Sequence, residues 1–265
     1  MLPAPRDLKT VDAIDGWCEA VGLGHARGFT GVLHVAAVHV DHAGTRHVFK
    51  IEPATPGSPV DRFCLELTRR WADHVVLTGA ILRAEPGLNY RRWRPEDSND
   101  ALDRWEASIH GQHGRAPTLV VLSRGAGLPW EHPILGSENT VLCVPRDAAL
   151  PNGLRARVLR SEVGADARIV LRRCAEVLGA RRVSIEAGPR TYLDLYTEPC
   201  AIDALLLSEY RGELSERLRA HAFVSPATLA RVGAFVTPLQ PTRDTPGLWR
   251  RATWRRALSD STKRA

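Results

Sequence analysis

Residues 73–90 read DHVVLTGAILRAEPGLNY, and this stretch decides the fold. A short apolar run stops at Thr78-Gly79, and a second apolar segment leads to a lone Arg83. An apolar run of this length that ends at a glycine predicts a buried strand. The segment after this strand has two interpretations: a plain turn and loop, or a cleft in which backbone N–H groups meet a phosphate.

Strand and helix patterns alternate on both sides of this stretch. Strands are expected at 31–40, 45–51, 73–79, 117–123, 139–145, 154–160, 181–188, 201–210, 229–239 and 247–254. Helices are expected at 7–21, 60–72, 100–109 and 166–180. The alternation predicts an α/β fold with a mostly parallel central sheet and helices on both faces. Because no linker is evident, residues 1–265 are expected to form a single domain.

Bulk composition excludes several classes of protein. Apolar residues make up 44% of the chain and charged residues 25%, which is ordinary for a globular protein. No apolar run reaches the roughly 18 residues that span a bilayer, and the first residues lack the apolar core of a signal peptide. We therefore expect a cytoplasmic protein without a membrane partner. The five cysteines are widely spaced, so a zinc site or disulfide framework is not indicated, and Cys64, Cys143 and Cys174 are expected in the core.

The positive charge is concentrated near the C-terminus. The chain carries a formal net charge of +6, and the stretch from Thr242 onward holds seven basic and two acidic residues. A basic tail from about residue 242 can contact nucleic acid, but a solvated end is the more common structure. Trp249, Trp254 and the nearby arginines are expected on a final strand with a basic, exposed face. Nucleic acid is therefore not expected as a partner.

Three expected strands end in similar chemistry. Their ends are Thr78-Gly79, Ser123-Arg124 and the run from Glu186 to Pro189. In open α/β sheets, ligands bind beyond the carboxyl ends of the strands, and a glycine there lets the backbone approach a ligand closely. Arg124 can pair with a phosphate such as the 2′-phosphate of NADP. Each motif alone is typical of a turn, but three together favour a nucleotide cleft.

The ordered set of segments resembles a known family. The carriers are VDRFCLELTRRWADHVVLTGAILRAEP, APTLVVLSRGAGLP, NTVLCVP, LRRCAEVLGARRVSIEAGP and AIDALLLSEY. Over roughly residues 30–255 the chain looks like the reductase domain of riboflavin biosynthesis, which has the dihydrofolate-reductase fold. The resemblance implies a homodimeric NADPH-dependent reductase of a ribosylaminopyrimidine phosphate, or of a related pyrimidine or pteridine-like heterocycle.

The resemblance also implies positions for the cofactor. The pyrophosphate and the cleft would lie near the turn into a helix at TGAILR, the adenosine end near the second strand end, and the nicotinamide near the third. The residues expected to contact NADPH are Thr78, Gly79, Ala80, Arg83, Ser123, Arg124, Ala187, Gly188 and Pro189.

The chain departs from the family at these same positions. Thr78-Gly79-Ala80-Ile81 stands where the family has Gly-x-Gly-Thr, so two glycines and a hydroxyl are lost. Ala187 replaces the first glycine of Glu-Gly-Gly-Pro, and it would be strained if that position required a positive φ. These losses support an alternative hypothesis, a non-catalytic or repurposed member of the fold that has lost cofactor binding.

Two carboxylates are candidates for catalysis. Asp41 is the nearest match to the family's Ser-Leu-Asp-Gly, and Glu186 follows the third strand. Either can orient a heterocycle or supply a proton during hydride transfer. The alternatives are a turn residue for Asp41, and a helix cap or an ion pair for Glu186. An ion pair with Glu85 or Asp73 is likewise the alternative to phosphate binding for Arg83.

No metal site is expected. The four histidines of the first two strands (His34, His39, His42 and His47) show no repeated ligand spacing. The signature of zinc deaminases, H-x-E followed by P-C-x-x-C, does not occur in the sequence, so no fused deaminase is expected.

Overall fold

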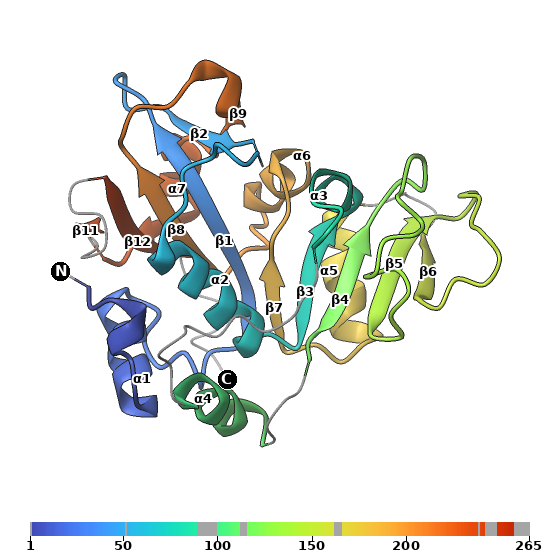
Figure 1. Ribbon diagram of the computed structural model, residues 1–265, viewed down its shortest axis with the longest axis horizontal. Coiled ribbons are helices and arrows are strands. Elements are labelled where there is room, and N and C mark those ends of the chain that lie inside the picture. Colours follow the sequence, from blue (N-terminus) through green and yellow to red (C-terminus); the bar gives the residue numbers. More distant parts are fainter. Residues whose placement is uncertain are drawn as a thin grey trace.

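A single twisted sheet runs through the molecule (Figure 1). The computed structural model describes residues 2–50, 52–88, 100–111, 116–161, 166–237, 239–241 and 248–256. Its main path has the strand order β10-β12-β8-β1-β7-β3-β4-β5-β6. These strands are β1 (Gly31–Val40), β3 (His74–Thr78), β4 (Thr118–Leu122), β5 (Thr140–Pro145), β6 (Arg157–Ser161), β7 (Arg182–Ile185), β8 (Ala204–Tyr210), β10 (Gly233–Phe235) and β12 (Trp249–Arg256).

The centre of the sheet is parallel. The pairings at the β10 edge of the sheet, and in the hairpin that β1 forms with the next strand of the chain, are antiparallel. All pairings from β8 through β1, β7, β3, β4 and β5 to β6 are parallel. β12 pairs antiparallel with both β8 and β10. The remaining strands, β2 (Arg46–Phe49), β9 (Arg219–Ala222) and β11 (Gln240–Pro241), lie off the main path. This is the mostly parallel α/β architecture that the alternating pattern predicts.

Helices cover both faces of the sheet (Figure 1). One face carries α1 (Val11–Ala20), α2 (Pro59–Trp71) and α4 (Ala101–His110), and the other carries α5 (Ala167–Glu176) and α7 (Pro226–Val232). Two short helices, α3 (Gly79–Ala84) and α6 (Pro189–Tyr192), follow strands directly. The 3-10 segments are η1 (Pro5–Asp7), η2 (Leu193–Tyr196) and η3 (Glu216–Leu218). None of the helices in the described part of the chain is both long and apolar enough to cross a membrane.

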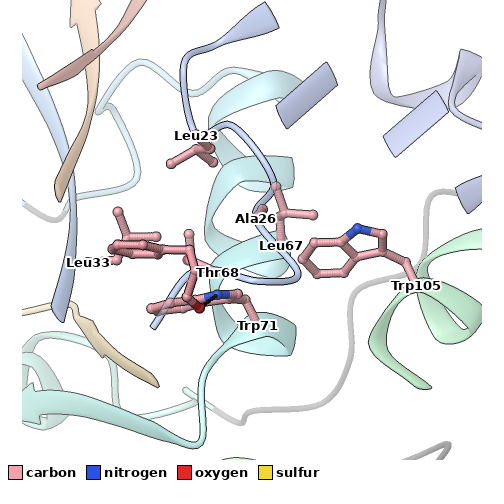
Figure 2. A pocket seen from close by; sticks show the side chains of 8 residues that line it. Leu23, Ala26, Leu33, Leu67, Thr68, Trp71 and Trp105 are labelled. Atoms are coloured by element: carbon pink, nitrogen blue, oxygen red, sulfur yellow. Dashed lines mark hydrogen bonds between the residues drawn. The ribbon is translucent and has the colours of Figure 1, made fainter. Parts of the chain in front are cut away.

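The core on the α2 face is close-packed. α2 begins at Ser58, whose side chain accepts a hydrogen bond from Asp61 N–H, and Pro59 occupies the first turn. Figure 2 shows the residual gap in this core, about 10 Å³ among apolar side chains that include Leu33, Leu67 and Trp105. A void of that size holds at most about one water molecule, so it is a packing defect and not a ligand site.

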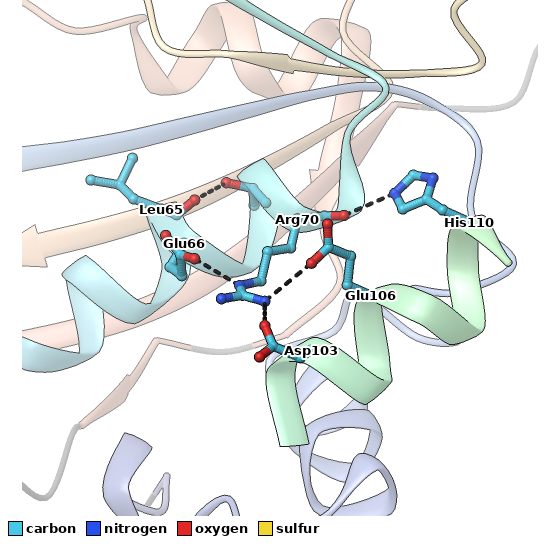
Figure 3. Close-up of polar contacts among 7 residues, drawn as sticks. Leu65, Glu66, Arg70, Asp103, Glu106 and His110 are labelled. Atoms are coloured by element: carbon cyan, nitrogen blue, oxygen red, sulfur yellow. Dashed lines mark hydrogen bonds and ion pairs between the residues drawn. The ribbon is translucent and has the colours of Figure 1, made fainter. Parts of the chain in front are cut away.

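A buried ion network joins α2 to α4 (Figure 3). The Arg70 side chain is 3% exposed and donates to Glu66 at 2.7 Å, Asp103 at 2.6 Å and Glu106 at 3.1 Å. The Arg70 carbonyl oxygen accepts from His110 Nε2 at 2.9 Å. These contacts hold the C-terminal end of α2, and the strand β3 that comes after it, in a fixed position.

The structure corrects two expectations about the C-terminal part. Residues 229–232 belong to helix α7 and not to a strand, because Ser225 caps the helix by accepting from Thr228 N–H, with Pro226 in its first turn. The last strand is present as β12, but only part of its basic charge is exposed: Arg256 is exposed and Arg250 and Arg255 are half-buried, whereas Arg251 is 1% exposed and contacts Ser58 at the start of α2. The rest of the expected basic tail, 242–247 and 257–265, lies outside the described residues.

Candidate functional site

The structure brings the three strand ends together. β7, β3 and β4 are neighbours in the sheet and run parallel, so Glu186, Thr78 and Ser123 all lie at the same edge. β7 lies between β1 and β3 in the sheet. The helix before β7, α5, and the helix before β3, α2, cover opposite faces of the sheet. Open α/β sheets bind ligands where neighbouring strands are connected through helices on opposite faces.

The junction from β3 into α3 is tightly packed. Thr78 ends β3 and is buried, and it makes no side-chain capping hydrogen bond to α3. A Cβ on Gly79 would approach Leu128 to 2.7 Å and the Ser123 hydroxyl oxygen to 3.1 Å. Gly79 is therefore needed for the contact between the ends of β3 and β4. The expected helix at TGAILR is confirmed as α3.

Two arginines at this edge are exposed and form no ion pair with a carboxylate of the described residues. Arg83 makes one long hydrogen bond, 3.4 Å, to the Gly127 carbonyl oxygen, and within the described residues it has no ion pair. Arg124 follows Ser123, whose hydroxyl accepts from Gly125 N–H at 3.0 Å, and no described carboxylate pairs with it. Ala80 is also exposed. The edge therefore presents positive charge that the described chain does not neutralise.

The segment after β7 is unstrained. Among the described residues no non-glycine residue has a positive φ, so the condition for strain at Ala187 is not met. A Cβ on Gly188 would meet nothing within 4 Å, and the Gly188 carbonyl oxygen accepts from Thr191 N–H to start α6. Pro189 is the first residue of α6, and its side chain lies outside the described atoms. The replacement of glycine by alanine therefore leaves this turn intact.

Glu186 is held by an arginine that the sequence did not single out. Arg69 of α2 donates to both carboxylate oxygens of Glu186, from Nε at 2.8 Å and from Nη2 at 2.6 Å. The Glu186 side chain is 8% exposed and that of Arg69 is 24% exposed. This is the ion pair that was the alternative to a catalytic role. Arg69 stands in a run of two arginines on an amphipathic helix, a pattern that does not tell which of them faces the strand end.

Glu85 adds a second carboxyl group near this pair. Burial raises the pKa of Glu85, and the negative charge of Glu186 raises it further, while Arg69 and His132 lower it. The backbone carbonyl of Glu85 accepts from His132 Nε2 at 3.1 Å, which fixes the end of the loop after α3. One arginine thus lies near two carboxyl groups, and the pKa of one of them, Glu85, is raised, which marks this group as a candidate for proton transfer.

Asp41 lies elsewhere. Since His34 is level with Ile185, Val35 is level with Glu186, and Asp41 is six residues beyond Val35, about 20 Å along β1. Its carboxylate accepts from Thr45 N–H and contacts His47 Nε2, both at 2.8 Å. The contact with His47 is the main cause that lowers the pKa of Asp41. The structure therefore places Asp41 in the turn between β1 and β2, and it does not bring Asp41 to Glu186.

The cysteines and histidines form no metal site in the described part of the chain. No three residues among the His, Cys, Asp and Glu of that part are placed to hold a metal ion. All five cysteines are free and buried, as expected for Cys64, Cys143 and Cys174. His34 is buried and in contact with the Tyr196 hydroxyl at 2.8 Å, and burial lowers its pKa to about 3. It is a neutral core residue.

Comparisons with known proteins identify the fold. No family model and no curated protein matches the sequence. Among solved structures, a pyrimidine reductase-like protein from Corynebacterium diphtheriae has a TM-score of 0.64 at 14% identity, over 94% of this chain and 100% of that chain. RibD from Acinetobacter baumannii has a TM-score of 0.61 at 14% identity, and the match covers 93% of this chain but only 64% of that chain.

A third similar structure combines two activities in its name. It is the diaminohydroxyphosphoribosylaminopyrimidine deaminase/5-amino-6-(5-phosphoribosylamino)uracil reductase from Thermotoga maritima, with a TM-score of 0.56 at 14% identity, over 93% of this chain and 62% of that chain. The chain thus spans less than two thirds of the two longer proteins. It has the fold of the RibD-type reductases, which confirms the fold expected from the resemblance.

Proposed function

We propose that this protein is an NADPH-dependent reductase of a pyrimidine or pteridine-like heterocycle. The observation that carries the proposal is the adjacency of three strand ends that combine a tight glycine, an unobstructed glycine and two exposed arginines. The Thermotoga maritima protein of similar fold is named as a phosphoribosylaminouracil reductase, which supports this substrate class.

The residues present fit a dinucleotide. Arg83 and Arg124 supply positive charge for phosphate groups, and Arg124 favours the 2′-phosphate of NADPH over the free hydroxyl of NADH. Gly188 leaves room beside the backbone, since a Cβ there would meet nothing within 4 Å. When bound, the nicotinamide supplies a hydride.

The polar groups beside this cleft suit an uncharged heterocycle. The pair of Arg69 and Glu186 offers N–H donors and carboxylate oxygens within one rigid unit. Glu85, whose pKa is raised, can hold a proton at a pH where an ordinary glutamate is ionised. In the proposed reaction Glu186 orients the substrate and Glu85 is the proton donor.

Calorimetry with NADPH, NADP⁺ and NADH tests the proposal. We expect NADPH to bind with a micromolar Kd and Arg124→Ala to weaken it about tenfold, since a charge-assisted phosphate contact is lost. Arg172→Ala is the matched control, because Arg172 is exposed on α5 away from the strand ends. Absence of binding to all three nucleotides at millimolar concentration would contradict the proposal.

A second candidate is a member of the fold that binds a ligand without turnover. The placement of the two predicted catalytic carboxylates favours this candidate. Both oxygens of Glu186 accept from Arg69, and Asp41 lies far from the strand ends. Binding of NADPH without oxidation, in the presence of a panel of aminopyrimidines and dihydropteridines, would support this candidate over the reductase.

A homodimer belongs to the same proposal. Phe235 and Val236 are 39% and 51% exposed at the edge strand β10, where a second sheet edge can pair. Sedimentation equilibrium of the wild type is expected to give twice the 29.2 kDa chain mass. A monomer at all concentrations would remove the dimer from the proposal and leave the nucleotide site untouched.

A further inference from the structure

A polar hollow of about 210 Å³ lies at the far end of β1. Figure 1 shows this end of β1 beside β2 and β9. The lining includes His39 of β1, Asp41 of the turn after it, Gly212 and Glu213 from the loop after β8, and Arg219. His39 is four residues beyond the level of Glu186, about 13 Å along the strand. None of the strand-end residues Thr78, Ser123 and Glu186 lines the hollow.

Two buried nitrogen atoms in this lining have no hydrogen-bond partner in the described chain. His39 is 3% exposed, and its Nε2 contacts the Gly212 carbonyl oxygen at 3.2 Å. Nε2 must carry the proton to donate to that oxygen, so Nδ1 is left over, buried and unpartnered. Nε of Arg219 is also buried and unpartnered, although Nη2 donates to the Leu214 carbonyl oxygen at 3.2 Å. A buried polar atom without a partner is unfavourable, so both atoms would gain from a ligand that pairs with them.

The charge on Arg219 is not balanced by a carboxylate. Within the described residues Arg219 forms no ion pair. The nearby Asp41 is already engaged through both oxygens, one by Thr45 N–H and the other by His47. Glu213 is exposed at the rim. A partly buried guanidinium without a counter-ion favours an anion from solution.

The pKa of His39 responds to the charge of Arg219. Burial, and then the positive charge of Arg219, lower the pKa of His39, so the imidazole is neutral without a ligand. A bound anion would offset the charge of Arg219 and allow Nδ1 to be protonated and to donate. The charged and titratable groups around His39 are Asp41, His42, His47, Tyr210, Arg211, Glu213 and Arg219.

We propose that this hollow binds a small oxyanion, a carboxylate or a phosphate group, through Nε of Arg219 and Nδ1 of His39. The ligand is either a free inorganic anion or the acidic group of a small metabolite. The site is independent of the nucleotide cleft.

The test is a titration of the full chain with inorganic phosphate and, separately, acetate, monitored by ¹⁵N NMR of the histidine rings. Saturable shifts of the His39 ring signals are expected, and Arg219→Gln should weaken the midpoint at least about tenfold. Arg217→Gln is the matched control, since Arg217 is exposed on η3 and loses the same charge. A second variant, His39→Gln, should also weaken binding, measured by amide shifts of Gly212 and Glu213.

Each outcome distinguishes a specific anion site from general screening of surface charge by added salt. Shifts that persist in Arg219→Gln, or that are reduced equally in Arg217→Gln, would show diffuse screening and overturn the proposal. The absence of any His39 shift at millimolar anion would overturn it as well. Binding of phosphate but not acetate assigns the site to phosphate groups, and the reverse assigns it to carboxylates. Titration of Arg124→Ala removes the strand-end cleft as a competing phosphate site, so either proposal can fail alone.

Discussion

Arg69 and Arg70 are neighbours on α2, and they serve two different regions of the molecule. Arg70 points to α4 and is enclosed by Glu66, Asp103 and Glu106 (Figure 3). Arg69 points to the end of β7 and holds one carboxylate, Glu186, at the edge of the candidate cleft. The difference shows that the environment of a charge decides its role. Arg70 lies among buried carboxylates that fix the fold, and Arg69 pairs with one carboxylate beside the proposed ligand site.

Removal of Arg70 gives the largest expected effect. Arg70→Ala takes the cation away from carboxylates that are 5% exposed at Glu66 and 1% exposed at Glu106. We expect a loss of about 3–5 kcal/mol in the free energy of unfolding, measured by urea denaturation. Arg62→Ala, an exposed position on the same helix, should change it by less than about 0.5 kcal/mol. Similar losses of unfolding free energy in Arg70→Ala and Arg62→Ala would contradict the structural role given to Arg70.

His34 tests how burial affects an ionisable group that has no partner of opposite charge. It is buried, no carboxylate contributes to its titration, and burial lowers its pKa from 6.5 to about 3. Below about pH 6.5 the unfolded chain gains a proton that the folded chain excludes, so stability falls as the pH drops. From pH 6.5 to about pH 5 the wild type should lose about 2 kcal/mol more than His34→Gln, by urea denaturation. Equal pH slopes would mean that His34 is protonated in the fold.

Two glycines at the strand ends allow a tightly packed position to be compared with an open one. A side chain on Gly79 would meet Leu128 and Ser123, whereas one on Gly188 would meet nothing. Gly79→Ala should therefore lower the unfolding free energy by about 1 kcal/mol, and Gly188→Ala by less than about 0.5 kcal/mol. Gly188→Ala is instead expected to weaken NADPH binding, measured by calorimetry. A reversed order of stabilities would contradict the packing at the end of β3.

Arg69 should matter less for stability than Arg70. Its side chain is 24% exposed, but Arg69→Ala leaves the Glu186 carboxylate, which is 8% exposed, without this cation, so a loss of about 1–3 kcal/mol is expected, below that of Arg70→Ala. The same variant is expected to lower kcat/KM for the reduced heterocycle. A stability loss equal to that of Arg70→Ala would make Arg69 a second structural arginine.

The sequence was sufficient for the sheet and insufficient for side-chain pairing. Strand and helix patterns placed β1, α2, β3 and α5 to within a few residues, because apolar periodicity reports which positions are buried. It misassigned residues 229–232, where the Ser225-Pro226 cap outweighs a short apolar run. It also missed that Arg251 would be buried, since the start of α2 that covers it is distant in the chain.

The candidate site shows the same contrast between predictable positions and unpredictable side-chain pairs. Glycine and arginine residues directly after expected strands identified Gly79, Arg124 and Gly188 as candidates, because the carboxyl ends of neighbouring parallel strands lie at one edge of the sheet. The pairing of Arg69 with Glu186 joins residues 117 positions apart, and nothing local encodes it. The length of β1 beyond β7, which carries Asp41 away from the cleft, depends on sheet register and is likewise invisible in one sequence.

Hydrogen–deuterium exchange with and without NADPH tests the central claim most directly. The account predicts slower amide exchange at 79–84, 123–128 and 186–192, the segments directly after the ends of β3, β4 and β7. It predicts no change at 101–110, where α4 carries the structural network, or at the β1–β2 turn. Protection confined to those two control regions, or no protection anywhere under saturating NADPH, would contradict the nucleotide site at the strand ends.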